Sequence, residues 1–157
     1  MIVKNLIEHQ NILEKLAHWH YTEWGYLYPE ENVQNFIEDL RGSKPCGPLP
    51  ATWVLMDGED VWGSASIIEQ DMTTNTDLSP WLANVYIHPD KRGLGLGQAL
   101  IKATLEQCQK RGFEELFLFT SDRECFYESM GWETLKQETY QGTKVSIMTL
   151  RFEPSPA

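Results

Sequence analysis

Apolar residues recur along the chain with two different spacings. Alternating or continuous short apolar runs, typical of strands, occupy 2–6, 52–56, 61–68, 81–87, 116–120, 132–140 and 144–152. Apolar residues three and four positions apart, typical of amphipathic helices, occupy 7–19, 30–40, 95–111 and about 123–130. The resulting order is strand, two helices, hairpin, strand, helix, strand, helix and hairpin. This order predicts a mixed α/β fold in which helices pack on a sheet.

Turn residues separate these elements. Asp57 and Gly58 mark a tight turn inside the first hairpin, and Gln141 and Gly142 mark the turn of the last one. Three prolines predict a loop over 41–50. With 157 residues and no internal repeat, the chain is expected to form a single domain over 1–152 with a loose tail over 153–157.

Composition excludes several classes of protein. No apolar run approaches the roughly 20 residues that cross a bilayer, and the first residues lack the apolar stretch of a signal peptide. We therefore expect a cytoplasmic protein without a membrane partner. The three cysteines have no CxxC spacing, which disfavours a disulfide framework and a structural metal site. We expect no metal.

The formal net charge of −10 changes the choice of partners. Nucleic-acid binding needs a basic face, so we expect no nucleic-acid partner. A negative protein attracts cationic substrates by electrostatic steering, although solubility alone also explains the acidity. The sequence leaves a monomer and a homodimer equally open.

The stretch 85–100 carries the clearest chemical signal. An apolar strand runs into a proline turn, then Lys91 and Arg92, then Gly93, Gly95 and Gly97 before a helix. Glycines let a ligand approach the backbone, and the N–H groups at a helix start attract anions. Three glycines in a turn that only packed a helix on a strand would cost helix stability without a gain. We predict a cradle for a phosphate-bearing ligand.

Three phosphate-binding patterns can be compared with this turn. The nucleotide P-loop string G-x-x-x-x-G-K-[ST] does not occur in the chain. The dinucleotide pattern G-x-G-x-x-G fails in both registers, because Gln98 and Leu100 stand where the last glycine belongs. The third pattern, R-x-x-G-x-G, is satisfied by Arg92, Gly95 and Gly97.

A second motif follows at a fitting distance. Phe126, Tyr127, Gly131 and Trp132 match the pattern F-Y-x-x-x-G-[FW]. With both motifs and this element order, nearly the whole chain resembles the GCN5-related N-acetyltransferase (GNAT) superfamily of acyl-CoA-dependent enzymes. The resemblance implies the acyl-CoA N-acyltransferase fold, with a central mixed, mostly antiparallel sheet of six to seven strands flanked by about four helices.

The resemblance also implies an activity. The expected function is transfer of an acetyl group from acetyl-CoA directly to a primary amine, of a small cationic molecule or of a peptide or protein, in a ternary complex. A non-catalytic acyl-CoA-binding module is the alternative. The residues that match the cofactor-binding positions of the family are Tyr86, Ile87, Arg92, Gly93, Leu94, Gly95, Leu96, Gly97, Gln98 and Phe126.

Acyl transfer to an amine also needs an acid and a base. An alkylammonium group has a pKa of about 10, so a base must take its proton before it can attack. Tyr127 matches the tyrosine that acts in this family as general acid toward the leaving thiolate. Glu69 and Asp71, after the second strand of the first hairpin, are candidate general bases, and Asn84 could hold a water molecule.

An aromatic segment at 19–28 suggests where the acceptor binds. Aromatic faces attract cationic amines, and acidic residues lie among them, although packing of a helix end explains the aromatic residues equally well. The expected acceptor-binding residues are Trp24, Tyr26, Trp81 and Asn84. Of the other candidates, His18 and His20 are expected to lie at the surface, and Cys125 to be a buried, inert thiol rather than a nucleophile.

Overall fold

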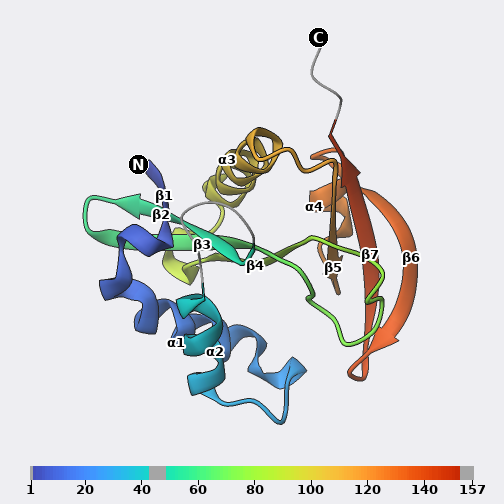
Figure 1. The fold of residues 1–157 in the computed structure, drawn as a ribbon, viewed down its shortest axis with the longest axis horizontal. Coiled ribbons are helices and arrows are strands. Elements are labelled where there is room, and N and C mark those ends of the chain that lie inside the picture. Colours follow the sequence, from blue (N-terminus) through green and yellow to red (C-terminus); the bar gives the residue numbers. More distant parts are fainter. Residues whose placement is uncertain (1, 43–48, 153–157) are drawn as a thin grey trace.

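The structure is a computed structural model, and it describes residues 2–42 and 49–152. It contains one seven-stranded sheet in the order β1-β2-β3-β4-β5-β7-β6 (Figure 1). The strands are β1 Ile2–Asn5, β2 Ala51–Asp57, β3 Asp60–Ile68, β4 Trp81–Ile87, β5 Glu115–Thr120, β6 Glu133–Tyr140 and β7 Thr143–Arg151. All neighbours are antiparallel except β4 and β5, which are parallel. The mixed, mostly antiparallel sheet is confirmed.

Helices cover both faces of this sheet. The α-helices are α1 Leu13–Trp24, α2 Val33–Arg41, α3 Leu96–Lys110 and α4 Glu124–Glu128. Short 3-10 turns are η1 Leu6–Glu8, η2 Gln10–Ile12, η3 Gly25–Leu27 and η4 Pro89–Lys91. In Figure 1, α1 and α2 lie on one side of the sheet and α3 on the other. The part of the expected 41–50 loop at 43–48 and the expected tail at 153–157 lie outside the described residues.

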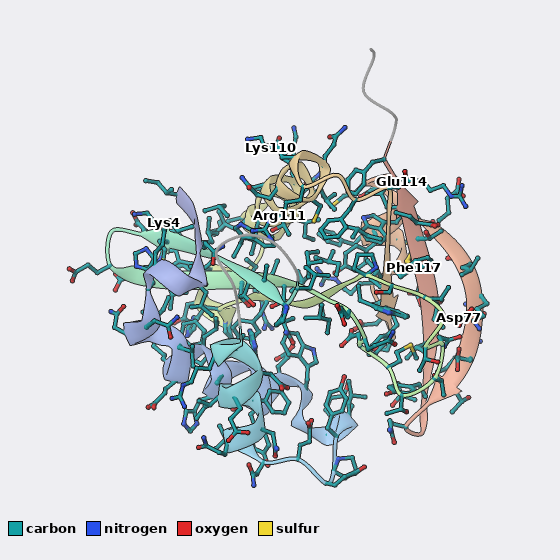
Figure 2. All side chains as sticks on the ribbon, viewed as in Figure 1. Lys4, Asp77, Lys110, Arg111, Glu114 and Phe117 are labelled. Atoms are coloured by element: carbon teal, nitrogen blue, oxygen red, sulfur yellow. The ribbon has the colours of Figure 1, made fainter. Side chains whose placement is uncertain are left out.

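The alternation along β2 explains the two layers. Trp53 and Leu55 pack in the core with α3 and α4, whereas Val54 and Met56 pack with α1 and α2. Successive side chains of a strand point to opposite faces, so a continuously buried strand needs cover on both. In Figure 2, Lys110 lies at the periphery of the molecule, whereas Phe117 is buried inside it.

The first two helices differ from the expected ranges. The predicted helix at 7–19 is two 3-10 turns followed by α1, which begins at Leu13 and continues to Trp24. Its buried stripe extends one turn further than the apolar pattern because His20 occupies the next buried position. The predicted helix at 30–40 begins instead at Val33, because the side chain of Asn32 caps it by accepting from the N–H groups of Gln34 and Asn35.

The sheet opens in its middle. β4 and β5 share one register pair, Trp81 with Phe117, and diverge beyond it within the described residues. On its other side, β4 bulges against β3, because Ser66 pairs with Ala83 and Ser64 with Tyr86. Two residues of β4 therefore oppose one residue of β3, which bends the strand.

No helix of the described residues is long and apolar enough to cross a membrane.

Candidate functional site

A cavity of about 630 Å³ lies where β4 and β5 diverge. Its wall is formed by the end of α1, η3, β4, the glycine-rich turn, the start of α3, the residues after β5, and α4. Cavities of this size hold small molecules and cofactors. The two sequence motifs therefore face one space, although they lie about 30 residues apart in the chain.

The glycine-rich turn places backbone N–H groups on this cavity. Gly93 and Gly95 adopt φ angles of +81° and +76°, in the left-handed region that favours glycine. A Cβ atom at either position would have no neighbour within 4 Å, so the space beside the turn is open. α3 begins next, with no acidic residue in its first turn. The unpaired N–H groups of a helix start carry partial positive charge.

Most residues predicted to bind a cofactor line this cavity. These are Tyr86, Ile87, Arg92, Gly93, Gly95, Leu96, Gly97, Gln98 and Phe126. Leu94 does not line it, and its residue surface is 66% exposed. The residues on either side of it, Gly93 and Gly95, line the cavity instead. The expected contribution of Leu94 to cofactor binding is mainly through the backbone N–H groups of the turn, and it stays a prediction.

Arg92 is held at the mouth of the cavity by three contacts. Its Nε donates to the carbonyl oxygen of Ile87 at 2.8 Å. Its guanidinium lies 5.5 Å from the ring centre of Tyr86 and 3.6 Å from Oε2 of Glu23 in α1. No pattern in the sequence predicts the ion pair with Glu23, since the two residues are distant in the chain. A ligand phosphate would compete with this carboxylate for Arg92.

Tyr127 lies in the wall of the same cavity as the turn. The residue is 9% exposed and lines the cavity from α4. Its ring packs edge to face on Phe126 and Trp132, with centroids 5.1 and 6.0 Å away. Burial raises the pKa of Tyr127 to about 12, against the opposing effect of Arg123. The phenol is therefore protonated at neutral pH and able to donate a proton or a hydrogen bond.

The two candidate bases lie in different environments. Asp71 lines the cavity, and burial of its carboxyl raises the pKa to about 8. The hydroxyl of Tyr28, another wall residue, donates to the backbone carbonyl of Asp71 at 3.4 Å. Glu69 is exposed and does not line the cavity. The structure therefore separates the two carboxylates, which sequence alone could not do.

The expected acceptor residues divide in the same way. Trp24, Tyr26 and Asn84 line the cavity. Trp81 is fully buried and lies outside the wall, which corrects that expectation. Its indole N–H donates to the carbonyl of Leu78 at 2.7 Å, and its ring packs on Phe117 in the paired part of β4 and β5. The strands diverge only beyond this pair.

Two further expectations are wrong. His20 is 1% exposed, and its Nε2 lies 2.7 Å from Oγ of Ser64. The apolar pattern does not predict that His20 is buried in α1, because histidine counts as a polar residue. Cys125 is exposed rather than buried.

No group of three or more metal-ligating side chains gathers within 2–42 and 49–152.

One comparison with known proteins shows a family. The family model described as an acetyltransferase (GNAT) domain matches residues 49–134. No curated protein sequence matches the chain. Solved structures match over nearly the whole chain, at identities that show the fold alone.

Three of these structures show which kinds of acetyltransferase share the fold. An aminoglycoside 6′-N-acetyltransferase complexed with coenzyme A has a TM-score of 0.77 and 15% identity, with 100% of both chains covered. The protein yncA of Salmonella typhimurium, with its cofactor acetyl-CoA, has a TM-score of 0.73 and 14% identity, covering 100% of this chain and 96% of that one. A ribosomal-protein-alanine N-acetyltransferase from Brucella melitensis has a TM-score of 0.73 and 16% identity, with 97% of this chain and 100% of that chain covered.

Proposed function

Because this chain belongs to the GNAT family of acetyltransferases, we propose that it transfers the acetyl group of acetyl-CoA directly to a primary amine. The observation that carries the proposal is the shared cavity, which brings the helix-start N–H groups together with Tyr127 and Asp71. Two structural neighbours were solved with coenzyme A or acetyl-CoA, which supports an acyl-CoA donor. A binding module without catalysis would not need a protonated tyrosine and a carboxyl of raised pKa on the same cavity.

The anionic part of acetyl-CoA fits the end of the cavity formed by the turn. The N–H groups of Gly97 and Gln98 at the start of α3 would bind the pyrophosphate, with Lys91 and Arg92 adding positive charge. The edge of β4 beyond Trp81 has no strand partner on the β5 side within the described residues, so the pantetheine arm could pair with its backbone. A backbone N–H at 85–87 would polarise the thioester carbonyl.

The transfer then requires three atoms to change partners. The amine nitrogen forms a bond to the carbonyl carbon, and the bond from that carbon to sulfur breaks. Asp71 takes one proton from the ammonium before the attack and later releases it to solvent. Tyr127 gives its phenolic proton to the departing thiolate, and the second proton lost from the nitrogen as the amide forms restores the phenol. A phenol and a thiolate differ in proton affinity, so the thiolate can equally be stabilised by a hydrogen bond from Tyr127.

The acceptor end of the cavity favours a small cationic amine. Trp24, Tyr26, Tyr28 and Phe36 form an aromatic wall there, and Asp71 lies beside it. Aromatic faces and a carboxylate attract an ammonium group. The neighbours named as aminoglycoside acetyltransferases act on amines of this kind, whereas the ribosomal-protein neighbour makes a peptide amine the second candidate.

The first test is release of coenzyme A thiol from acetyl-CoA in the presence of spermidine, kanamycin, single amino acids or short peptides. We expect release with a cationic amine that lacks a carboxylate, because the acceptor end offers aromatic rings and an acid rather than a basic side chain. Binding of coenzyme A without release for any acceptor would favour the non-catalytic binding module.

The rate should depend on pH through Asp71. A base acts only when deprotonated, and burial raises the pKa of Asp71 to about 8. The value of kcat/KM for the amine should therefore rise about tenfold per pH unit below that value and level off above it. Tyr127, with its pKa raised to about 12, should stay protonated throughout this range.

Matched substitutions assign this pH dependence. Asp71→Asn should move the rising limb from about pH 8 toward the pKa of about 10 of the amine itself. It should also lower the rate near pH 8 on the order of 100- to 10,000-fold, as expected for the loss of a general base. Glu69→Gln removes an exposed carboxylate two residues away, outside the cavity, and should leave the profile unchanged. A shifted limb in Glu69→Gln together with an unshifted limb in Asp71→Asn would refute the assignment.

A further inference from the structure

A chain of buried hydrogen bonds runs beneath the cavity, from α1 through β3 to β4. Nε2 of His20 lies 2.7 Å from Oγ of Ser64, and this hydroxyl donates to the backbone carbonyl of Asn84 at 2.9 Å. His20 and Ser64 are 1% and 0% exposed. None of the steps described above uses either side chain.

The direction of each hydrogen bond can be deduced. A carbonyl oxygen only accepts, so the single proton of the Ser64 hydroxyl is directed at Asn84. The Ser64 oxygen must then accept from His20, which requires a proton on Nε2 of the imidazole. Burial lowers the pKa of His20 to about 3, so the ring is neutral and carries this proton alone. Its Nε2 cannot serve as the proton acceptor of the reaction.

The chain ends at the most distorted residue of β4. Asn84 has a φ angle of +54°, which is rare for a residue other than glycine. It lies in the bulge, where two residues of β4 oppose one of β3. A backbone conformation of this kind costs free energy and persists only where the surroundings hold it. The hydrogen bond from Ser64 is one such restraint, and the side chain of Asn84 supplies another by donating to Ser66 at 3.2 Å.

The same imidazole contacts both ends of the cavity. The ring of His20 lies 5.2 Å from that of Trp24 in the acceptor wall and 6.0 Å from that of Tyr86 on β4. Trp24 and Tyr86 also contact each other, with centroids 6.0 Å apart. A shift of His20 would therefore move the acceptor wall and the cofactor strand together.

We propose that His20 and Ser64 are positioning residues for acyl transfer, which fix the bulge of β4 and thereby the strand edge at 85–87 on which the thioester would lie. This inference rests on the proposed function. It assigns His20 a donor role toward Ser64, not a base role toward the substrate. Their effect should appear in turnover more than in coenzyme A affinity. The pyrophosphate would bind at the turn and the start of α3, whereas the described contacts of His20 and Ser64 are to α1 and β4.

The experiment compares variants that keep or remove the donor. His20→Gln retains an N–H group that can reach Ser64, whereas His20→Leu and Ser64→Ala break the chain. Thr104→Val is the matched control: like Ser64→Ala it removes a buried hydroxyl that donates to a backbone carbonyl, here that of Leu100 at 2.9 Å, but in α3 and outside the cavity wall. Turnover is measured by thiol release with the most active amine of the panel, and affinity by calorimetric titration with coenzyme A.

We expect His20→Leu and Ser64→Ala to lower kcat at least about tenfold, since small misplacement of reacting groups is costly. His20→Gln and Thr104→Val should stay within about threefold, with coenzyme A affinity little changed in all four. The proposal is overturned if His20→Leu and Ser64→Ala retain wild-type kcat. It is also overturned if His20→Gln is as inactive as His20→Leu and loses the pH dependence, which would make His20 a base.

A measurement on the unaltered protein remains decisive if the variants do not fold or if no amine is acetylated. Nitrogen NMR of the labelled imidazole should show Nε2 protonated and Nδ1 unprotonated for His20, unchanged between pH 5 and 9. The opposite tautomer, or titration within this range, would overturn the proposal. Absence of thiol release from wild-type protein together with the expected tautomer would instead count against the proposed function alone.

Discussion

Replacing Tyr127 by Phe is expected to lower kcat for acetyl transfer on the order of 100- to 1000-fold, the range typical of the loss of a general acid. The substitution removes one oxygen atom and leaves the ring, which packs on Phe126 and Trp132. Within the described residues the phenolic hydroxyl makes no hydrogen bond to the protein. Its removal should therefore leave the melting temperature and the affinity for coenzyme A close to those of the wild type.

A second buried tyrosine supplies the control. The hydroxyl of Tyr140 accepts a hydrogen bond from the backbone N–H of Thr73 at 2.9 Å, and the residue does not line the cavity. Tyr140→Phe should lower the melting temperature, because it leaves that N–H without its partner, and should keep kcat. Thiol release and thermal unfolding distinguish the two variants. If Tyr127→Phe keeps wild-type turnover, the departing thiolate does not depend on Tyr127.

The layers of the fold could be predicted because short-range patterns specify them. The continuous apolar run of β2 requires cover on both faces, and the structure provides α3 on one and α1 with α2 on the other. The boundaries of α1 could not be predicted, since its last turn is fixed by a buried histidine whose partner, Ser64, lies 44 residues away. Local periodicity carries no information about such a partner.

The candidate site was predictable to a similar degree. The turn and the α4 motif have chain-local signatures, and the structure brings both to one cavity. The choice between Glu69 and Asp71 depends on how the loop after β3 folds back against Tyr28, which no local pattern specifies. Trp81 was expected to bind the acceptor because it belongs to β4, the strand that borders the cavity. It lies in the core instead, because β4 and β5 are still paired at this residue.

Replacing Gly95 by Leu is expected to weaken coenzyme A binding by at least about 100-fold, as measured by calorimetric titration. Two physical effects contribute. Gly95 has a φ angle of +76°, which a side chain with a Cβ atom adopts only with strain. A Cβ atom there would also project into open space beside the N–H groups that start α3, where the leucine side chain would occupy the volume proposed for the pyrophosphate.

The two effects can be separated at the other end of the same helix. Gly112 has a φ angle of +85°, and a Cβ atom there would also have no neighbour within 4 Å. Gly112 does not line the cavity, so Gly112→Leu carries comparable backbone strain without blocking a ligand. Both variants should lose melting temperature to a similar extent, but only Gly95→Leu should lose coenzyme A. Equal loss of binding in both would mean that strain in α3, not occupied space at the turn, controls affinity, and the phosphate cradle would have to be placed elsewhere.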